Sequence, residues 1–269
     1  MIYQPPEALR DITALVIDMD GVLWRGDDPL PGLVAFFELL RERPIAFRLA
    51  TNNASKSPGQ YVDKFASMGV EIAPDEILTS AGVTAQHIAA VAPGASVYAI
   101  GDGLRQAVLD YGLHLSNGEQ ADFVAVGWDP KLTYTELSEA TLLIRAGARF
   151  IGTNPDRTWP SERGLLPGNG AILACLQAAT DVEPFIIGKP ERAIFHAALA
   201  AIGAEPAHTA MLGDRLETDI LGAQNAGLPT ILVLTGVSDE AGLAASSVKP
   251  DWIFDDIQEL TRAWSALPR

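Results

Sequence analysis

The chain has 269 residues, of which 48% are hydrophobic and 20% are charged, so it can bury a sizeable core and is not a disordered protein. Its 34 acidic residues outnumber 19 basic ones, which gives a formal net charge of −15 at pH 7. A chain this acidic repels phosphate backbones and anionic membranes, and we therefore expect neither nucleic acid nor a membrane among its partners. An anionic substrate would have to be held locally by a metal ion or by a placed Lys or Arg.

The cysteine content and the first residues bear on the cellular compartment. The single cysteine, Cys175, excludes an intrachain disulfide, and we expect it to be buried in an apolar helical run. Residues 1–11 lack the basic start and apolar run of a signal peptide, and no apolar stretch reaches the roughly 20 residues of a membrane helix. We therefore expect a cytoplasmic protein.

Strands and helices are predicted to alternate from one end of the chain to the other. Short apolar runs predict strands at residues 14–17, 45–50, 96–100, 123–126, 149–152, 184–187, 209–212, 229–234 and 252–254. Helix-period patterns predict helices at residues 33–41, 59–68, 83–91, 104–111, 134–146, 170–179, 192–201 and 216–226. This order predicts an α/β fold with a mainly parallel sheet that helices cover on both faces. Arg48, inside the second predicted strand, is charged and does not fit a strand that helices cover on both faces.

The candidate functional residues lie before and after a long middle segment. Neither a fixed-period repeat nor a low-complexity linker divides the chain, so we expect a second domain to be inserted rather than appended. We place this insert at residues 81–183, between the two parts of a core domain at 1–80 and 184–269.

Two aspartates directly follow the first predicted strand. Asp18 and Asp20 lie two residues apart on an extended segment, so their side chains point to the same side, and Gly21 permits a sharp turn. At the carboxyl end of a parallel strand they would face the crevice in which open α/β sheets bind ligands. Two carboxylates this close are costly unless a cation lies between them or one of them carries a proton, and this cost is a reason to expect magnesium. A solvated loop is the alternative, since Asp and Gly are common in turns.

Polar residues also follow two other predicted strands. Thr51, Asn52 and Asn53 come after the second strand, where their side chains can donate hydrogen bonds to an oxyanion, although a helix cap is an alternative. Lys189 follows the strand at 184–187 and can neutralise phosphate and carboxylate charge, or else be a solvated surface residue.

A fourth strand end carries Asp214, with Asp219 a little over one helical turn later. One of these carboxylates can ligate a metal while the other orients the ligands, or the acids at this helix start can simply favour its positive end. Because four such segments follow four strands, a shared site is the better interpretation, and it requires residues 18 and 214 to lie close enough to share an ion.

In this order the residues resemble the four motifs of the haloacid dehalogenase (HAD) superfamily of aspartate-nucleophile phosphotransferases. The chain is most similar to the NagD-like branch, which holds 4-nitrophenylphosphatase, phosphoglycolate phosphatase and pyridoxal phosphatase relatives. The segments that carry the resemblance lie at 18–24, 51–53, 153–156, 167–170, 187–190 and 213–220. It implies a Rossmannoid core with a large inserted α/β cap that shields the reaction and selects the leaving group. It also implies a homodimer formed through the cap.

The resemblance implies a magnesium-dependent phosphatase acting on a small phosphorylated metabolite. Asp18 would form an aspartyl-phosphate, and Asp20 would protonate the leaving alcohol and then activate water. Mg²⁺ would be held by Asp18, the Asp20 backbone carbonyl and Asp214, with Asp219 in an outer shell. Thr51 and Lys189 would bind the phosphoryl oxygens.

Several assignments stay open at this point. Asn154 and Asp156, inside the insert, would reach the substrate or merely form a turn. Trp24 would wall the pocket or pack in the core. The alternative functions are a phosphotransferase or mutase on the same core, and a non-catalytic phospho-aspartate sensing module. The sensing module is disfavoured by the length of the chain and by Asp20, for which a stable phospho-aspartate switch has no use.

Overall fold

The structure is a computed structural model that describes residues 5–161 and 164–268. The chain forms two compact units, each of which draws on more than one segment. The core unit comprises Met1–Thr51, Pro58–Leu78 and Lys189–Arg269, and the inserted unit comprises Asn52–Ser57 and Thr79–Gly188. Within the described residues, no helix is both long and apolar enough to span a membrane.

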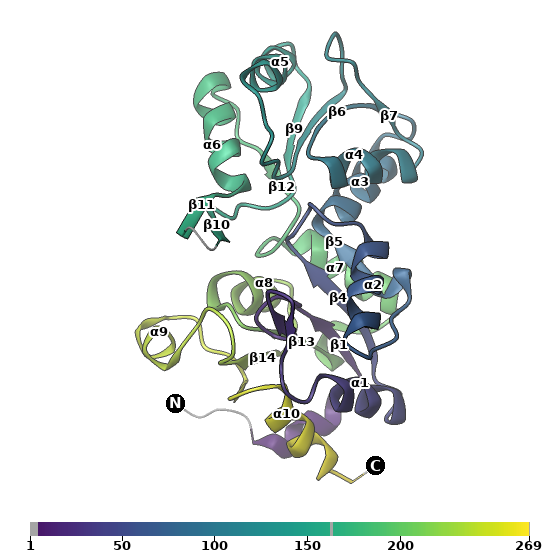
Figure 1. Cartoon of the computed structure of the whole chain (residues 1–269), viewed down its shortest axis with the longest axis vertical. Coiled ribbons are helices and arrows are strands. Elements are labelled where there is room, and N and C mark those ends of the chain that lie inside the picture. Colours follow the sequence, from purple (N-terminus) through teal and green to yellow (C-terminus); the bar gives the residue numbers. More distant parts are fainter. Residues whose placement is uncertain (1–4, 162–163, 269) are drawn as a thin grey trace. The chain divides into compact units, whose positions relative to one another are not determined.

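A sheet of six strands forms the centre of the core unit (Figure 1). The strand order is β15 (Trp252–Phe254), β14 (Thr230–Val233), β13 (Thr209–Gly213), β1 (Ala14–Ile17), β4 (Ala46–Thr51) and β5 (Ile77–Thr79). β1 pairs in parallel with β13 on one side and with β4 on the other. All four β1 residues are buried, which explains why this strand is a continuous apolar run.

Helices cover both faces of the core sheet. On one face, α1 (Leu33–Glu42), α2 (Pro58–Ser67) and α10 (Ile257–Ser265) pack in one hydrophobic core with Leu15 and Ile17 of β1. The intervening residue of β1 faces the opposite side, where α7 (Arg192–Ile202) contacts β1, β4 and α8 (Leu221–Asn225). The other core elements are 3-10 helices at Pro6–Asp11, Pro74–Glu76 and Pro206–His208, the hairpin strands β2 (Trp24–Arg25) and β3 (Asp28–Pro29), a π-helical turn at Leu216–Ile220, and α9 (Glu240–Ala245).

The inserted unit has a parallel sheet of its own (Figure 1). Its strands follow the order β12 (Phe185–Ile186), β9 (Arg149–Gly152), β8 (Phe123–Val126), β6 (Ser96–Ile100) and β7 (His114–Leu115). α5 (Tyr134–Arg145) and α6 (Asn169–Thr180) pack on this sheet through a second hydrophobic core. α3 (Ser80–Val91) packs against α4 (Asp102–Asp110), which contacts β6. β10 (Thr158–Ser161) and β11 (Gly164–Pro167) form an antiparallel hairpin.

The predicted α/β class with parallel sheets is confirmed, and every predicted strand overlaps an observed one. The helix predicted at 216–226 is instead a π-helical turn followed by α8. The insert predicted at 81–183 differs at both ends from the inserted unit. Residues 184–188 belong to this unit because β12 pairs with β9, although the sequence prediction assigned them to the core.

The structure accounts for Arg48 and corrects the expectation for Cys175. The Arg48 guanidinium donates a hydrogen bond of 2.8 Å to the carbonyl of Ala201 in the last turn of α7, so its charged end satisfies a helix terminus. Cys175 is exposed, which contradicts the expectation that it is buried. Leu173 and Leu176 mark the buried face of α6, and this helix is too uniformly apolar for the sequence to reveal which face is buried.

Candidate active site

The first aspartate of the site continues β1 beyond its last strand residue. The backbone N–H of Asp18 donates to the carbonyl of Leu212 at 2.8 Å, so the β1–β13 pairing fixes its position. Its side chain is buried. Gly21 then turns the chain with φ of +88°, a conformation that residues with a Cβ rarely adopt. Strand pairing and turn together point the carboxylate of Asp18 out of the end of the sheet.

Four of the predicted residues meet at this end of the core sheet. The ammonium of Lys189 forms ion pairs with the carboxylates of Asp18 and Asp219, the latter at 2.7 Å. Carboxylate oxygens of Asp18, Asp214 and Asp219 all lie within 4.8 Å of one another. All four side chains are buried. Residues 18 and 214 are therefore close enough to share one cation.

A π-helical turn places Asp219 beside Asp214. Its Oδ2 accepts hydrogen bonds from the backbone N–H groups of Asp214 and Arg215 at 3.2 and 3.0 Å. Its Oδ1 faces Lys189. Both oxygens of Asp219 are thus engaged by donors, as suits a residue that orients its neighbours. Single turns of π-helix occur often at functional sites.

The loop after β14 encloses the carboxylate of Asp214. Its Oδ2 accepts a hydrogen bond of 2.7 Å from the backbone N–H of Val237. A Cβ placed on Gly236 would lie only 1.8 Å from the same oxygen. The backbone can approach Asp214 this closely only because residue 236 has no side chain. Sequence reasoning did not identify this loop.

The charges in the cluster shift one another's protonation. Burial raises the pKa of Asp18 well above its usual range, and Asp219 and Asp214 add to this, although Lys189 opposes it. Burial and the charge of Asp219 raise the pKa of Asp214 to about 6. Burial disfavours the charged form of Lys189, but the carboxylates of Asp18 and Asp219 outweigh it and raise its pKa. Three carboxylates around a single ammonium leave negative charge that a proton or a cation must offset.

Asp20 and Thr51 lie in the core unit near this cluster. Asp20 is exposed and does not join the three carboxylates of the described site; its Oδ1 accepts a hydrogen bond of 2.8 Å from the indole Nε1 of Trp24. Thr51 is buried at the end of β4. Burial and the negative charges of Asp20 and Asp18 raise the pKa of Tyr61. Tyr61 was not predicted, because a Tyr in an amphipathic helix is typical of a core residue.

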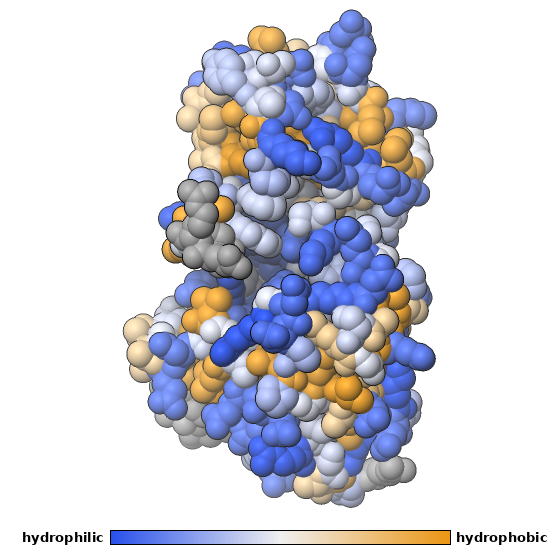
Figure 2. All heavy atoms as spheres, viewed as in Figure 1, coloured by the Kyte–Doolittle hydropathy of each residue, from blue (hydrophilic) through white to orange (hydrophobic). Residues whose placement is uncertain are grey.

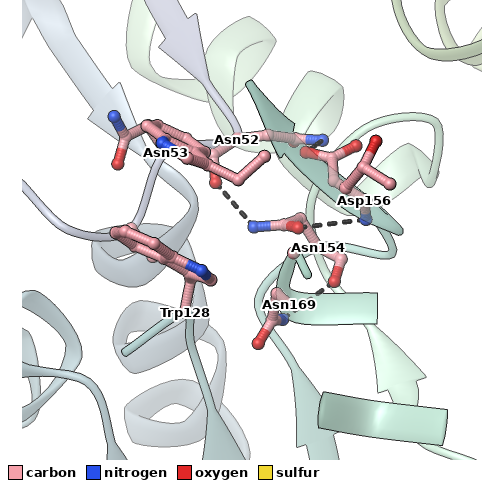
Figure 3. Close-up of a pocket in the computed structure, with 10 residues that line it drawn as sticks. Asn52, Asn53, Trp128, Asn154, Asp156 and Asn169 are labelled. Atoms are coloured by element: carbon pink, nitrogen blue, oxygen red, sulfur yellow. Dashed lines mark hydrogen bonds between the residues drawn. The ribbon is translucent and has the colours of Figure 1, made fainter. Parts of the chain in front are cut away.

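The other predicted residues belong to the inserted unit (Figure 3). Asn52 donates to Asp156 Oδ2 at 3.2 Å, and Asn154 donates to the carbonyl of Asn52 at 2.7 Å. The N–H of Asp156 donates to Asn154 Oδ1 at 3.1 Å, which forms a turn, one of the two interpretations of this segment. Asn53 Oδ1 accepts from the N–H and hydroxyl of Ser55 and thus also forms a local turn.

These residues line a pocket within the inserted unit, together with Asn169 of the segment 167–170 and two tryptophans that the sequence did not indicate. Trp128 and Trp159 stack with ring centroids 4.9 Å apart and an interplanar angle of 19°. Asn169 is buried and donates to the carbonyls of Val126 and Asn154 at 3.1 and 2.9 Å. The pocket therefore offers flat aromatic surface and polar groups together, as pockets for polar small molecules do. No sequence pattern links two tryptophans 31 positions apart.

Family models match both parts of the core. A haloacid dehalogenase-like hydrolase model matches residues 15–114, and a HAD-hydrolase-like model matches residues 186–260. The matched ranges contain Asp18, Thr51, Lys189, Asp214 and Asp219.

Similar proteins cover nearly the whole chain. The acid sugar phosphatase of Staphylococcus epidermidis is 42% identical over 250 residues, which are 93% of this chain and 96% of that protein. The 4-nitrophenylphosphatase of Thermotoga maritima has a similar structure, with a TM-score of 0.90, 36% identity, and 94% and 98% of the two chains covered. NagD from Escherichia coli K-12 has a TM-score of 0.86 and 32% identity, with 92% and 98% covered. The chain therefore belongs to the haloacid dehalogenase-like hydrolases, in their NagD-like branch.

Proposed function

We propose that this phosphatase hydrolyses a small phosphomonoester, with magnesium, through an aspartyl-phosphate intermediate on Asp18. Its relatives are named phosphatases, and its family is one of hydrolases. The observation that carries the mechanism is the buried cluster in which Lys189 contacts Asp18 and Asp219 while Asp214 lies beside them. Burial of so much like charge is costly, and buried clusters of perturbed charges of this kind are typical of functional sites.

Asp18 serves as the nucleophile. Its carboxylate oxygen attacks phosphorus, forms an aspartyl-phosphate and displaces the alcohol, so that one difficult step is divided into two. Lys189 reduces the repulsion between the attacking carboxylate and the phosphate, and the hydroxyl of Thr51 donates to a phosphoryl oxygen. These donors act where charge spreads over the phosphoryl group in the transition state.

Asp20 transfers the protons. It gives a proton to the departing alcohol oxygen and later takes one from the water that hydrolyses the aspartyl-phosphate. Its exposed carboxylate can exchange protons with solvent between these steps. This group favours hydrolysis over a sensing module, which would need its phospho-aspartate to persist.

The cluster fits a divalent cation. Its donors are carboxylate oxygens, which Mg²⁺ prefers. Burial, together with the neighbouring carboxylates, raises the pKa values of Asp18 and Asp214, so a bound cation would favour their charged forms. Asp18, Asp214 and the backbone carbonyl of Asp20 would hold the ion, with Asp219 orienting them. The cation supplies charge neutralisation between the carboxylates and the phosphate.

We assign the alcohol part of the substrate to the class of sugars and similar polyols. Acid sugar phosphatases are among the relatives, and the inserted unit carries the stacked Trp128–Trp159 pair beside Asn154 and Asp156. Aromatic faces suit the apolar faces of sugar rings, and amide and carboxylate groups suit their hydroxyls. Asn52, which follows Thr51 directly in the chain, and Asn53 belong to the same pocket.

The test is hydrolysis of a panel of phosphomonoesters by wild type and Asp18→Asn, with magnesium and after chelation. We expect phosphate release only with magnesium, and a loss of at least about 10³-fold in kcat for the variant, because the nucleophile is removed. Asp11→Asn, at an exposed position of the core unit, serves as the control and should keep full activity. Substantial magnesium-dependent activity of Asp18→Asn would disprove the mechanism. Phosphate transfer to an added sugar instead of water would indicate a phosphotransferase.

A further inference from the structure

Trp24 is a buried side chain that the proposed mechanism does not yet use. Its indole is fully buried, whereas its Nε1–H donates to Oδ1 of the exposed Asp20 at 2.8 Å. The backbone reinforces this link. The N–H of Gly21 donates to the carbonyl of Trp24 at 2.8 Å, and Asp20 and Trp24 form an isolated β-bridge. Side chain and main chain of Trp24 thus both hold the loop that carries Asp20.

One face of α2 fixes the indole ring. Phe65 contacts it edge-on with centroids 4.9 Å apart, and Tyr61 lies roughly parallel to it at 6.4 Å. The Lys64 ammonium sits 4.4 Å from the ring centroid and is itself held by the carbonyl of Gly26 at 2.6 Å. Residues at positions i, i+3 and i+4 share one helix face, so these three contacts act on the ring together. The direction of the N–H bond is therefore set by packing.

A fixed N–H donor restrains the carboxylate that accepts from it. Oδ1 of Asp20 is held by the indole, and Oδ2 remains for proton exchange with the substrate oxygen. The Lys64 ammonium is also attracted to the face of the indole, which adds to the restraint on the ring. An exposed Asp without this contact would sample several rotamers, and only a fraction of them would suit proton transfer.

We propose that Trp24 is a positioning residue that holds Asp20 in the orientation needed to protonate the leaving alcohol; this rests on the proposed function. The leaving group separates this role from a purely structural one. A sugar alkoxide is a poor leaving group and needs the proton, whereas 4-nitrophenolate is a stable anion and departs without it. Loss of positioning should therefore affect sugar phosphates selectively.

The experiment compares kcat/KM for 4-nitrophenyl phosphate with kcat/KM for the preferred substrate among glucose 6-phosphate, ribose 5-phosphate and glycerol 3-phosphate. kcat/KM reports the steps up to departure of the leaving group and is not affected by hydrolysis of the aspartyl-phosphate. Trp24→Phe keeps an aromatic ring but removes the donor. We expect a loss of about tenfold or more on the sugar phosphate and less than about twofold on the aryl phosphate.

Three further variants make the result decisive. Asp20→Asn should show the same selectivity with a larger amplitude, and Trp264→Phe, another buried tryptophan of the core unit, should show none. Trp24→3-benzothienylalanine keeps the shape of the indole while sulfur replaces the N–H, so it tests the same contact if Trp24→Phe folds poorly. Equal losses on both substrates, or no loss on either, would overturn the proposal. A wild-type protein that hydrolyses neither ester would instead contradict the proposed function.

Discussion

Asp214 shows at the scale of one residue how burial prepares a group to bind a cation. Its pKa is raised to about 6 by burial and by the charge of Asp219. A proton and a divalent cation compete for this carboxylate, so the affinity for magnesium should fall as the pH falls below about 6. Because the pKa of Asp18 is raised as well, the affinity should fall by at least about tenfold per pH unit. Calorimetric titration between pH 5 and pH 8 measures this, and a pH-independent affinity would contradict it.

The same shift makes a prediction about stability without magnesium. The folded-state pKa of Asp214 lies above 3.8, the ordinary value for an aspartate, so its contribution to stability is complete below that pH and is lost as the pH rises through about 6. The free energy of unfolding of the wild type should therefore decrease relative to that of Asp214→Asn as the pH rises over this range. Urea denaturation in a chelator at several pH values tests the direction. A difference that stays constant with pH would show that Asp214 does not titrate as described.

At the scale of elements, the site depends on short irregular segments rather than on the regular helices. The π-helical turn at Leu216–Ile220 places the carboxylate of Asp219 against the N–H groups of Asp214 and Arg215. The loop at Gly236 places the N–H of Val237 against the carboxylate of Asp214. A Cβ at residue 236 would overlap the Asp214 carboxylate. We therefore expect Gly236→Ala to displace that carboxylate, weaken magnesium binding by at least about tenfold and lower stability by about 1–3 kcal/mol.

Gly242→Ala is the matched control for this prediction. Gly242 lies in α9 of the same unit, where a Cβ would come no closer than 3.2 Å to a side-chain oxygen of Asp239. Alanine also favours helix more than glycine does, so this variant should keep the magnesium affinity. Calorimetry and thermal denaturation of both variants measure the effects. Wild-type affinity in Gly236→Ala would show that the loop does not constrain Asp214.

At the scale of the whole molecule, the inserted unit has what an independent domain needs. It has its own parallel sheet and its own hydrophobic core, and residues 79–188 supply nearly all of it. We expect this fragment to fold alone with a cooperative thermal transition, at lower stability than in the full chain. The missing residues 52–57 include the Asn52 carbonyl that accepts from Ser80 and Asn154. Circular dichroism of the fragment tests this, and a non-cooperative melt would contradict it.

The homodimer through the cap stays a prediction.

The sequence alone was sufficient to predict the α/β class and to identify the residues of the carboxylate cluster. Strands buried on both faces appear as continuous apolar runs, and the polar residues that end them must meet at one edge of a parallel sheet. This argument relates Asp18, Lys189, Asp214 and Thr51 without coordinates. It does not extend to features that depend on packing, such as the exposure of Cys175 or the helix-end contact of Arg48.

Only the tertiary structure decided which groups surround each functional side chain. Trp24 and Phe65 are 41 positions apart, and Asp214 and Val237 are 23 apart, so no local pattern predicts their contacts. The stacking of Trp128 on Trp159 likewise follows from how the β10–β11 hairpin folds. Local sequence determines which residues can end a strand, because backbone pairing and side-chain alternation are short-range. Orientation, burial and pKa depend on neighbours that only the folded chain brings together.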